Sequence, residues 1–166
     1  MREADVAIRM KEPSQADLVR KRLMNIRMRL YASPDYIAKN GTPERIEDIS
    51  DHRLICQNPR SAQVASGLAL VQRLMTYNVS SMLTVNNYFG VLQSVIHGLG
   101  IGMLPDYSTQ ELDSVVRVLP DVESVEVPVY LAYPEELRQS KRIAAFRDFV
   151  EAEILATRRR QRDQDA

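Results

Sequence analysis

The sequence has no tryptophan, only two histidines and a single cysteine, Cys56, among its 166 residues. One cysteine cannot form an internal disulfide, which fits a reducing compartment. No stretch approaches the length of a membrane span and no secretory signal opens the chain, so we expect a cytoplasmic protein without a membrane partner. Basic and acidic residues balance at 22 each, so the chain lacks the excess positive charge that neutralises nucleic-acid phosphates.

Patterns of catalysis and metal binding are also missing. Zinc needs three or four close protein ligands, whereas His52, His97 and Cys56 form no such pattern in the sequence. We find no Gly-x-Ser-x-Gly motif, no Gly-rich phosphate loop and no carboxylate pair spaced for acid–base chemistry. We therefore expect no catalytic residue, no metal and no cofactor, and a binding module instead of an enzyme. Cys56 is interpreted as a small buried residue on a strand, in preference to a redox switch.

What the sequence does contain is clearest at residues 84–105, which predict a strand, a helix and a second strand. The apolar positions that define one helix face are Tyr88, Val91, Leu92, Val95, Ile96 and Leu99. Gly98 and Gly100 predict the end of this helix. Asn86 and Asn87 stand where it begins, and there unpaired backbone N–H groups can meet an anion or a polar ligand. Such a βαβ unit implies a parallel sheet, which binds ligands beyond the carboxyl ends of its strands.

The remaining elements follow from periodicity and turn residues. We predict further strands at residues 3–9, 18–24, 26–31, 53–56, 68–74, 77–85, 115–119 and 127–133. Asn25 is expected to separate the strand at residues 18–24 from the strand that begins at residue 26. In the latter strand apolar and polar residues alternate, as in a half-buried strand, and Arg29 lies on the polar side. Pro128 predicts an edge strand or a crossover.

Helices are expected where capping residues precede an apolar stripe. Ser33 and Pro34 begin one short helix that Asn40 and Gly41 end, and Thr42-Pro43 begins another that reaches about residue 49. A long helix at residues 140–156 closes the chain. Its predicted buried stripe comprises Ile143, Phe146, Phe149, Val150 and Ile154.

A set of motifs occurs in order along nearly the whole chain. They lie at residues 5–9 (DVAIR), 30–36 (LYASPDY), 41–43 (GTP), 48–54 (DISDHRL), 85–87 (VNN), 98–105 (GLGIGMLP), 116–120 (VRVLP) and 145–149 (AFRDF). In this order they closely resemble the effector-binding (substrate-binding) domain of LysR-type transcriptional regulators. The resemblance implies an α/β, periplasmic-binding-protein-like (type 2) fold of two lobes joined by two crossover strands. Residues 1–29 and 121–166 would form an incomplete first lobe, and residues 30–120 the second lobe.

The resemblance also implies a function. A small-molecule effector, expected to be a small organic acid or amino acid, would bind between the lobes of a homo-oligomer and regulate transcription. Promoter DNA would be bound only through an N-terminal helix-turn-helix that this sequence does not contain. A solute-binding transport protein is the alternative, which the missing signal peptide and the regulator-like order of motifs disfavour.

Three of the residues that we expect to contact the effector follow predicted strands. Arg9 follows a first-lobe strand at the predicted cleft edge, where the family often places a carboxylate-binding group; an exposed strand-end arginine is the equal alternative. Gln57 and Asn58 begin a loop that would face the same space.

The other expected contacts surround the central helix. Asn86 and Asn87 would lie at the cleft edge of the second lobe, and capping of the helix is compatible with ligand contact. Tyr88 would either form a wall of the cleft or pack inward. Met103 would line the floor of the cleft or, in the favoured alternative, belong to the core.

Overall fold

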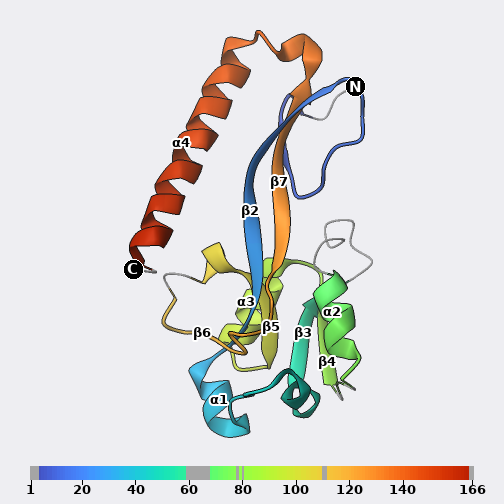
Figure 1. Ribbon diagram of the computed structural model, residues 1–166, viewed down its shortest axis with the longest axis vertical. Coiled ribbons are helices and arrows are strands. Elements are labelled where there is room, and N and C mark those ends of the chain that lie inside the picture. Colours follow the sequence, from blue (N-terminus) through green and yellow to red (C-terminus); the bar gives the residue numbers. More distant parts are fainter. Residues whose placement is uncertain (1–3, 59–67, 78, 80, 110–111, 165–166) are drawn as a thin grey trace. The chain divides into compact units, whose positions relative to one another are not determined.

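The computed structural model describes residues 4–58, 68–77, 79, 81–109 and 112–164. The chain divides into two compact units, which we call unit 1 (residues 1–25 and 128–166) and unit 2 (residues 26–127). Both boundaries fall inside long strands, β2 (Leu18–Ala32) and β7 (Val125–Pro134) (Figure 1). The chain therefore passes from one unit to the other within a strand each time. The assignment of residues 1–29, 30–120 and 121–166 to the lobes of the family stays a prediction.

Unit 1 consists of strands packed against one long helix. β1 (Ala7–Arg9) pairs antiparallel with β7, with Ala7 opposite Ala132. A short turn of helix, η3 (Glu135–Leu137), leads into α4 (Lys141–Gln164). The buried centre of this unit is formed by Leu131, Tyr133 and Ile143.

The predicted stripe of α4 is partly wrong. Ile143 is buried as expected, but Phe146 and Phe149 are 38% and 62% exposed. The half-buried positions further along the helix include Glu151, whose carboxylate lies 2.6 Å from the Lys21 ammonium of β2. On this part of α4, Glu151 and not Phe149 therefore contacts β2.

Unit 2 is built on a mixed sheet. The second half of β2 runs antiparallel to β5 (Ile101–Pro105), and β5 runs parallel to β3 (Arg53–Gln57). β3 in turn runs parallel to β4 (Ser81–Val85), and β6 (Val116–Arg117) pairs with β2. The helix α3 (Tyr88–Ile96) connects β4 to β5 and packs on the sheet, which confirms the predicted βαβ unit (Figure 1).

Close approach between α3 and β5 depends on a glycine. A Cβ atom added at Gly102 would lie 2.4 Å from Val95 Cγ2 and 2.9 Å from Val91 Cγ1. Both valines belong to the apolar cluster beneath α3, whose buried members are Tyr31, Ile55, Val91, Val95, Leu104 and Val115. At the far end of the helix, Gly98 adopts φ 70°, a conformation that favours glycine and stops α3 as predicted.

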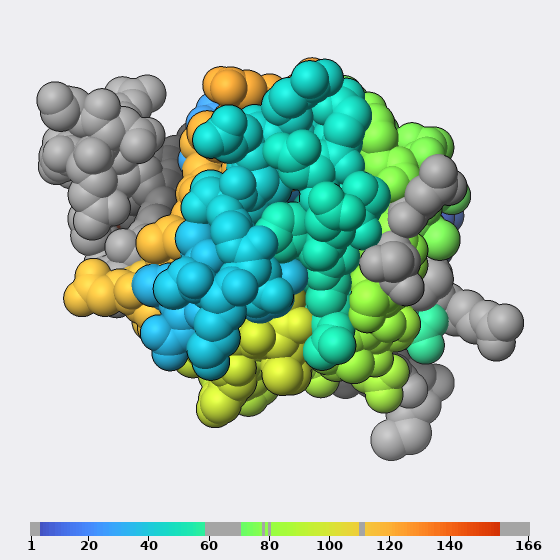
Figure 2. All heavy atoms as spheres, turned by 90° about the horizontal axis from the view of Figure 1, so that it is seen from below, coloured from blue at the N-terminus to red at the C-terminus, as the bar shows by residue number. Residues whose placement is uncertain are grey.

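The end of unit 2 that holds the amino ends of β3 and β4 is covered by short helices. Ser33 caps α1 (Pro34–Asn40) by accepting a hydrogen bond from the backbone N–H of Tyr36, as the sequence predicts. The 3₁₀ segment η1 (Ile46–Asp51) lies beside α1 on this face (Figure 2). It begins later than predicted, because Asp48, and not Thr42, accepts the backbone N–H groups of the entering turn.

A buried polar pair joins these helices to the sheet. The Tyr36 hydroxyl lies 3.2 Å from His52 Nδ1 and accepts a hydrogen bond from the backbone N–H of Arg53. Burial lowers the pKa of His52, although Asp51 and Asp48 oppose this shift. His52 is thus a structural histidine, and it is only 5% exposed.

The structure corrects two predicted strand features and decides between the two alternatives given for a third. Residues 68–75 form the helix α2 (Leu68–Met75), because the buried Val71 and Leu74 recur at helical spacing. β2 continues through Asn25 without a break. β7 is hydrogen-bonded to β1 on one side and β2 on the other, so of the two alternatives at Pro128 the edge strand is excluded, and β7 is the strand in which the chain crosses from unit 2 to unit 1.

Candidate functional site

The carboxyl ends of the three parallel strands of unit 2 meet at one edge of the sheet, which we call the carboxyl edge. β3 ends at Gln57, β4 at Val85 and β5 at Pro105. The chain leaves β4 through Asn86 directly into α3. This is the edge at which parallel sheets bind ligands.

Hydrogen bonds tie two of these strand ends together. Gln57 is 6% exposed, and its Nε2 donates to the backbone carbonyl of Asn86 at 3.1 Å. The backbone N–H of Asn58 donates to the carbonyl of Val85 at 2.8 Å. The turn that leads into α3 is therefore held in place by β3, and the predicted residues Gln57, Asn58 and Asn86 lie together.

The side-chain amide of Asn87 has an oxygen, Oδ1, that caps α3 and a nitrogen, Nδ2, that can bind a ligand. Its Oδ1 accepts a hydrogen bond from the backbone N–H of Gly90 at 2.8 Å and so caps α3, while the backbone is extended at φ −151°. The cap does not use the Nδ2 amide hydrogens. The helix N-terminus also carries a partial positive charge. This exposed end of the helix can therefore donate hydrogen bonds to a polar or anionic group.

Two phenols stand at the same edge. Tyr88 is the first residue of α3, and Tyr107 lies in η2 (Asp106–Ser108), which follows β5. Burial raises the pKa of Tyr88, with smaller contributions from Tyr107 and Cys56. Burial also raises the pKa of Tyr107, reinforced by Asp106. Both hydroxyls therefore keep their hydrogens at neutral pH and can donate hydrogen bonds.

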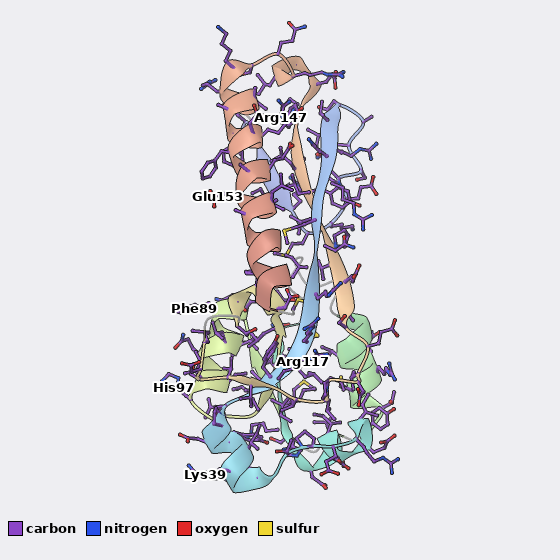
Figure 3. The ribbon with its side chains drawn as sticks, turned by 60° about the vertical axis from the view of Figure 1, so that its left-hand side comes forward. Lys39, Phe89, His97, Arg117, Arg147 and Glu153 are labelled. Atoms are coloured by element: carbon purple, nitrogen blue, oxygen red, sulfur yellow. The ribbon has the colours of Figure 1, made fainter. Side chains whose placement is uncertain are left out.

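Sequence reasoning missed Tyr107. The sequence signal for Tyr107 is its position just after a strand of the parallel sheet, β5. Asn58 and Asn86 occupy the same kind of position after β3 and β4. Phe89, also outside the predicted site, is 70% exposed at the start of α3, with His97 at the other end of the helix (Figure 3). His97 Nδ1 bonds locally to the carbonyl of Gln93 at 2.8 Å, as expected of a helix-end residue.

The other two predicted residues lie elsewhere. Met103 is 4% exposed within β5. Arg9 is an exposed residue of unit 1, where it lines a depression of about 360 Å³ together with Asp5, Gln15 and Asp17. The structure therefore gathers Gln57, Asn58, Asn86, Asn87 and Tyr88 at the carboxyl edge of unit 2.

Cys56 is a core residue next to this edge. It is 2% exposed, and burial raises the pKa of its thiol to about 12. A thiol with such a pKa carries almost no reactive thiolate at neutral pH. Within the described ranges, no three His, Cys, Asp or Glu side chains are grouped so that they could hold a metal ion. None of the described helices combines the length and apolarity that a bilayer span requires.

Comparison with known proteins places this geometry in a family. Residues 1–154 match the sequence model of the LysR substrate binding domain. The transcriptional regulator CrgA of Neisseria meningitidis serogroup C (strain 8013) is 25% identical over 158 residues, which make up 92% of this chain and 52% of CrgA. The uncharacterized HTH-type regulator YhjC of Escherichia coli K12 is 26% identical over 147 residues, or 86% of this chain and 49% of YhjC. The chain thus spans about half the length of these curated relatives.

Solved structures agree with the sequence comparison. The regulatory domain of CrgA from Neisseria meningitidis superposes with a TM-score of 0.74 at 23% identity, covering 92% of this chain and 76% of that domain. The AphB regulatory domain of Vibrio vulnificus gives a TM-score of 0.65 at 26% identity, with 91% and 76% covered. The predicted α/β, periplasmic-binding-protein-like fold is therefore confirmed. The family match, which takes in most of the chain, shows that this protein belongs to the LysR substrate-binding domain family.

Proposed function

We propose that this chain is the effector-sensing part of a LysR-type transcriptional regulator and binds a small metabolite at the carboxyl edge of unit 2. The observation that carries the proposal is the set of uncharged hydrogen-bonding groups at this edge. Asn87 Nδ2, the N-terminus of α3 and the hydroxyls of Tyr88 and Tyr107 supply donors. Such a set recognises a small polar molecule and offers no nucleophile–base pair, which supports sensing over catalysis.

Sensing would work by a shift of populations. A metabolite changes the balance between two states of the regulator only by binding one of them more tightly. The helix-turn-helix that binds promoter DNA, the homo-oligomer and the cytoplasmic location are parts of this proposal. The helix-turn-helix is supported by the curated relatives, which are named as HTH-type transcriptional regulators.

The fold itself accommodates small ligands. The regulatory domain of CcmR from Synechocystis PCC6803, solved in complex with 2-PG, shares this fold with a TM-score of 0.65 at 18% identity. We propose a small organic acid or amino acid as the effector of the present chain. Arg9 and Met103 stay predicted contacts, and the argument from the carboxyl edge does not depend on them.

The proposal is tested with a promoter fusion in cells that carry the complete regulator. We expect a metabolite to change reporter output in a dose-dependent way, and Asn87→Ser to shift the dose response to higher concentration because the amide donor is lost. The serine variant keeps the helix cap, so the fold is preserved. An unchanged dose response would remove Asn87 from the site. Turnover of the bound metabolite by the purified chain would contradict a purely sensory role.

A further inference from the structure

The side chain of Arg29 in β2 holds one of its guanidinium nitrogens, Nε, out of contact with water. The residue is half-buried, its Nε atom is fully buried, and among the described residues this atom has no hydrogen-bond partner. A guanidinium stays charged at any physiological pH, so its burial costs free energy unless a partner compensates. Arg27, two residues earlier on the same strand, is 52% exposed and lies 3.6 Å from Glu126.

The sequence pattern placed Arg29 on a polar, solvent-facing side of its strand. In the structure that side is covered, since Tyr31 on the same side is only 7% exposed and belongs to the cluster beneath α3. The alternation of polar and apolar residues was predicted correctly, but this face of β2 is open to water at Arg27 and is covered at Tyr31. A charged residue in such a place requires an explanation.

Strand register puts Arg29 in line with the carboxyl edge. Arg29 is opposite Leu104 of β5, and Tyr31 is opposite Gly102. Gly102 is also the partner of Ile55 in β3, so continuing that register by two residues brings Leu104 beside Gln57. Residues paired across strands point to the same face of the sheet. Gln57, Leu104 and Arg29 therefore form one row across three neighbouring strands, on the face that α3 covers.

The two polar ends of this row are within reach of one small ligand. Adjacent strands lie about 4.8 Å apart, which separates the Cα atoms of Arg29 and Gln57 by roughly 10 Å. Leu104 between them is fully buried and apolar. The row thus offers a cation at one end and the amides of the α3 turn at the other end, while Leu104 belongs to the core between them.

We propose that Arg29 anchors the carboxylate of the effector, whose uncharged remainder contacts the Gln57 side of the carboxyl edge. This inference rests on the proposed function and narrows it to small carboxylates. A guanidinium can hold a carboxylate through two parallel N–H···O bonds, which satisfies its charge and its Nε donor together. No sequence motif points to Arg29, because the row exists only once the three strands are paired.

The test uses matched pairs of probes that differ only in charge. Acetate, glycolate, succinate and benzoate are compared with acetamide, glycolamide, succinamide and benzamide. Binding to the isotope-labelled chain is followed by amide chemical shifts in NMR titrations. We expect the chain to prefer at least one carboxylate over its amide by tenfold or more.

Two neighbouring arginines provide the variant and its control. Arg29→Met keeps the length of the side chain and removes the charge, so we expect carboxylate affinity to fall at least tenfold while amide affinity is unchanged. Arg27→Met makes the same change at an exposed position and should leave both affinities unchanged. Without any ligand, Arg29→Met should unfold at the same or a higher urea concentration than the parent chain, because a half-buried guanidinium with an unpaired Nε is removed.

Each remaining outcome decides against the inference. Equal carboxylate binding by the parent and Arg29→Met would overturn the anchor role and leave the proposed effector site in place. Preference for amides, or no binding of either class, would also overturn it, while the reporter experiment judges the sensory function independently. If Arg29→Met does not fold, Arg29→Lys keeps the charge without the two-pronged geometry, and unchanged carboxylate affinity in that variant would contradict the bidentate anchor.

Discussion

The cap of α3 offers the most direct test of how the carboxyl edge is built. Asn87→Ala removes the oxygen that accepts the Gly90 N–H at 2.8 Å. Loss of an N-cap of this type costs about 0.5–2 kcal/mol, with about 1 kcal/mol typical. With a urea m-value of about 1.5 kcal/mol/M, a loss of ~1 kcal/mol lowers the unfolding midpoint by roughly 0.7 M. Far-UV circular dichroism in a urea titration measures this shift.

Two control variants separate the cap from other effects. Asn87→Ser keeps an oxygen that can accept the same N–H, so its midpoint should stay close to that of the parent chain. Asn86→Ala changes the exposed neighbouring asparagine, whose backbone carbonyl and not its side chain bonds to Gln57. We expect a change within about 0.5 kcal/mol there. The reasoning is refuted if Asn87→Ala is as stable as the parent, or if Asn87→Ser loses as much stability as Asn87→Ala.

Three further predictions concern packing, pH and thiol chemistry. Gly102→Ala should destabilise the chain by about 1–3 kcal/mol through overpacking, and adding Val95→Ala should recover part of this loss in urea titrations; additive losses would contradict the clash. His52 has a folded-state pKa below 6.5, so its contribution to stability is present above that pH and is lost as pH falls through the folded-state value. His52→Gln should flatten the dependence of the urea midpoint on pH between 7 and about 5, and an unchanged slope would count against a buried His52. Cys56 should resist a thiol reagent in the folded chain and react on unfolding, and rapid labelling of the native protein would disprove its core position.

Local chemistry made several elements readable from the sequence. Ser33 beside Pro34 predicted the start of α1, and Gly98 predicted the end of α3, because capping and a positive φ depend on only a few neighbouring residues. The βαβ unit was likewise visible, since its helix shows a clear apolar face next to a glycine-rich stop. From this unit the carboxyl edge and its asparagines followed directly.

Where the sequence misled, a distant contact decided the outcome. The apolar run of α2 is too short to distinguish helix from strand by its pattern alone. Phe149 is 62% exposed, whereas Glu151 of the same helix contacts Lys21, a residue 130 positions away in the sequence. Tyr107 joined the candidate site only because β5 runs parallel to β3 and ends at the same edge.

The sequence alone therefore determined the family, the α/β class, the helix caps and the amides at the head of α3, because each depends on neighbouring residues or on motif order. Only the tertiary structure decided which side of β2 is covered and that Arg29, Leu104 and Gln57 share one row. Strand order and register are set by pairing between segments far apart in the chain, and a periodic pattern shows that a strand has two faces without showing what lies on each.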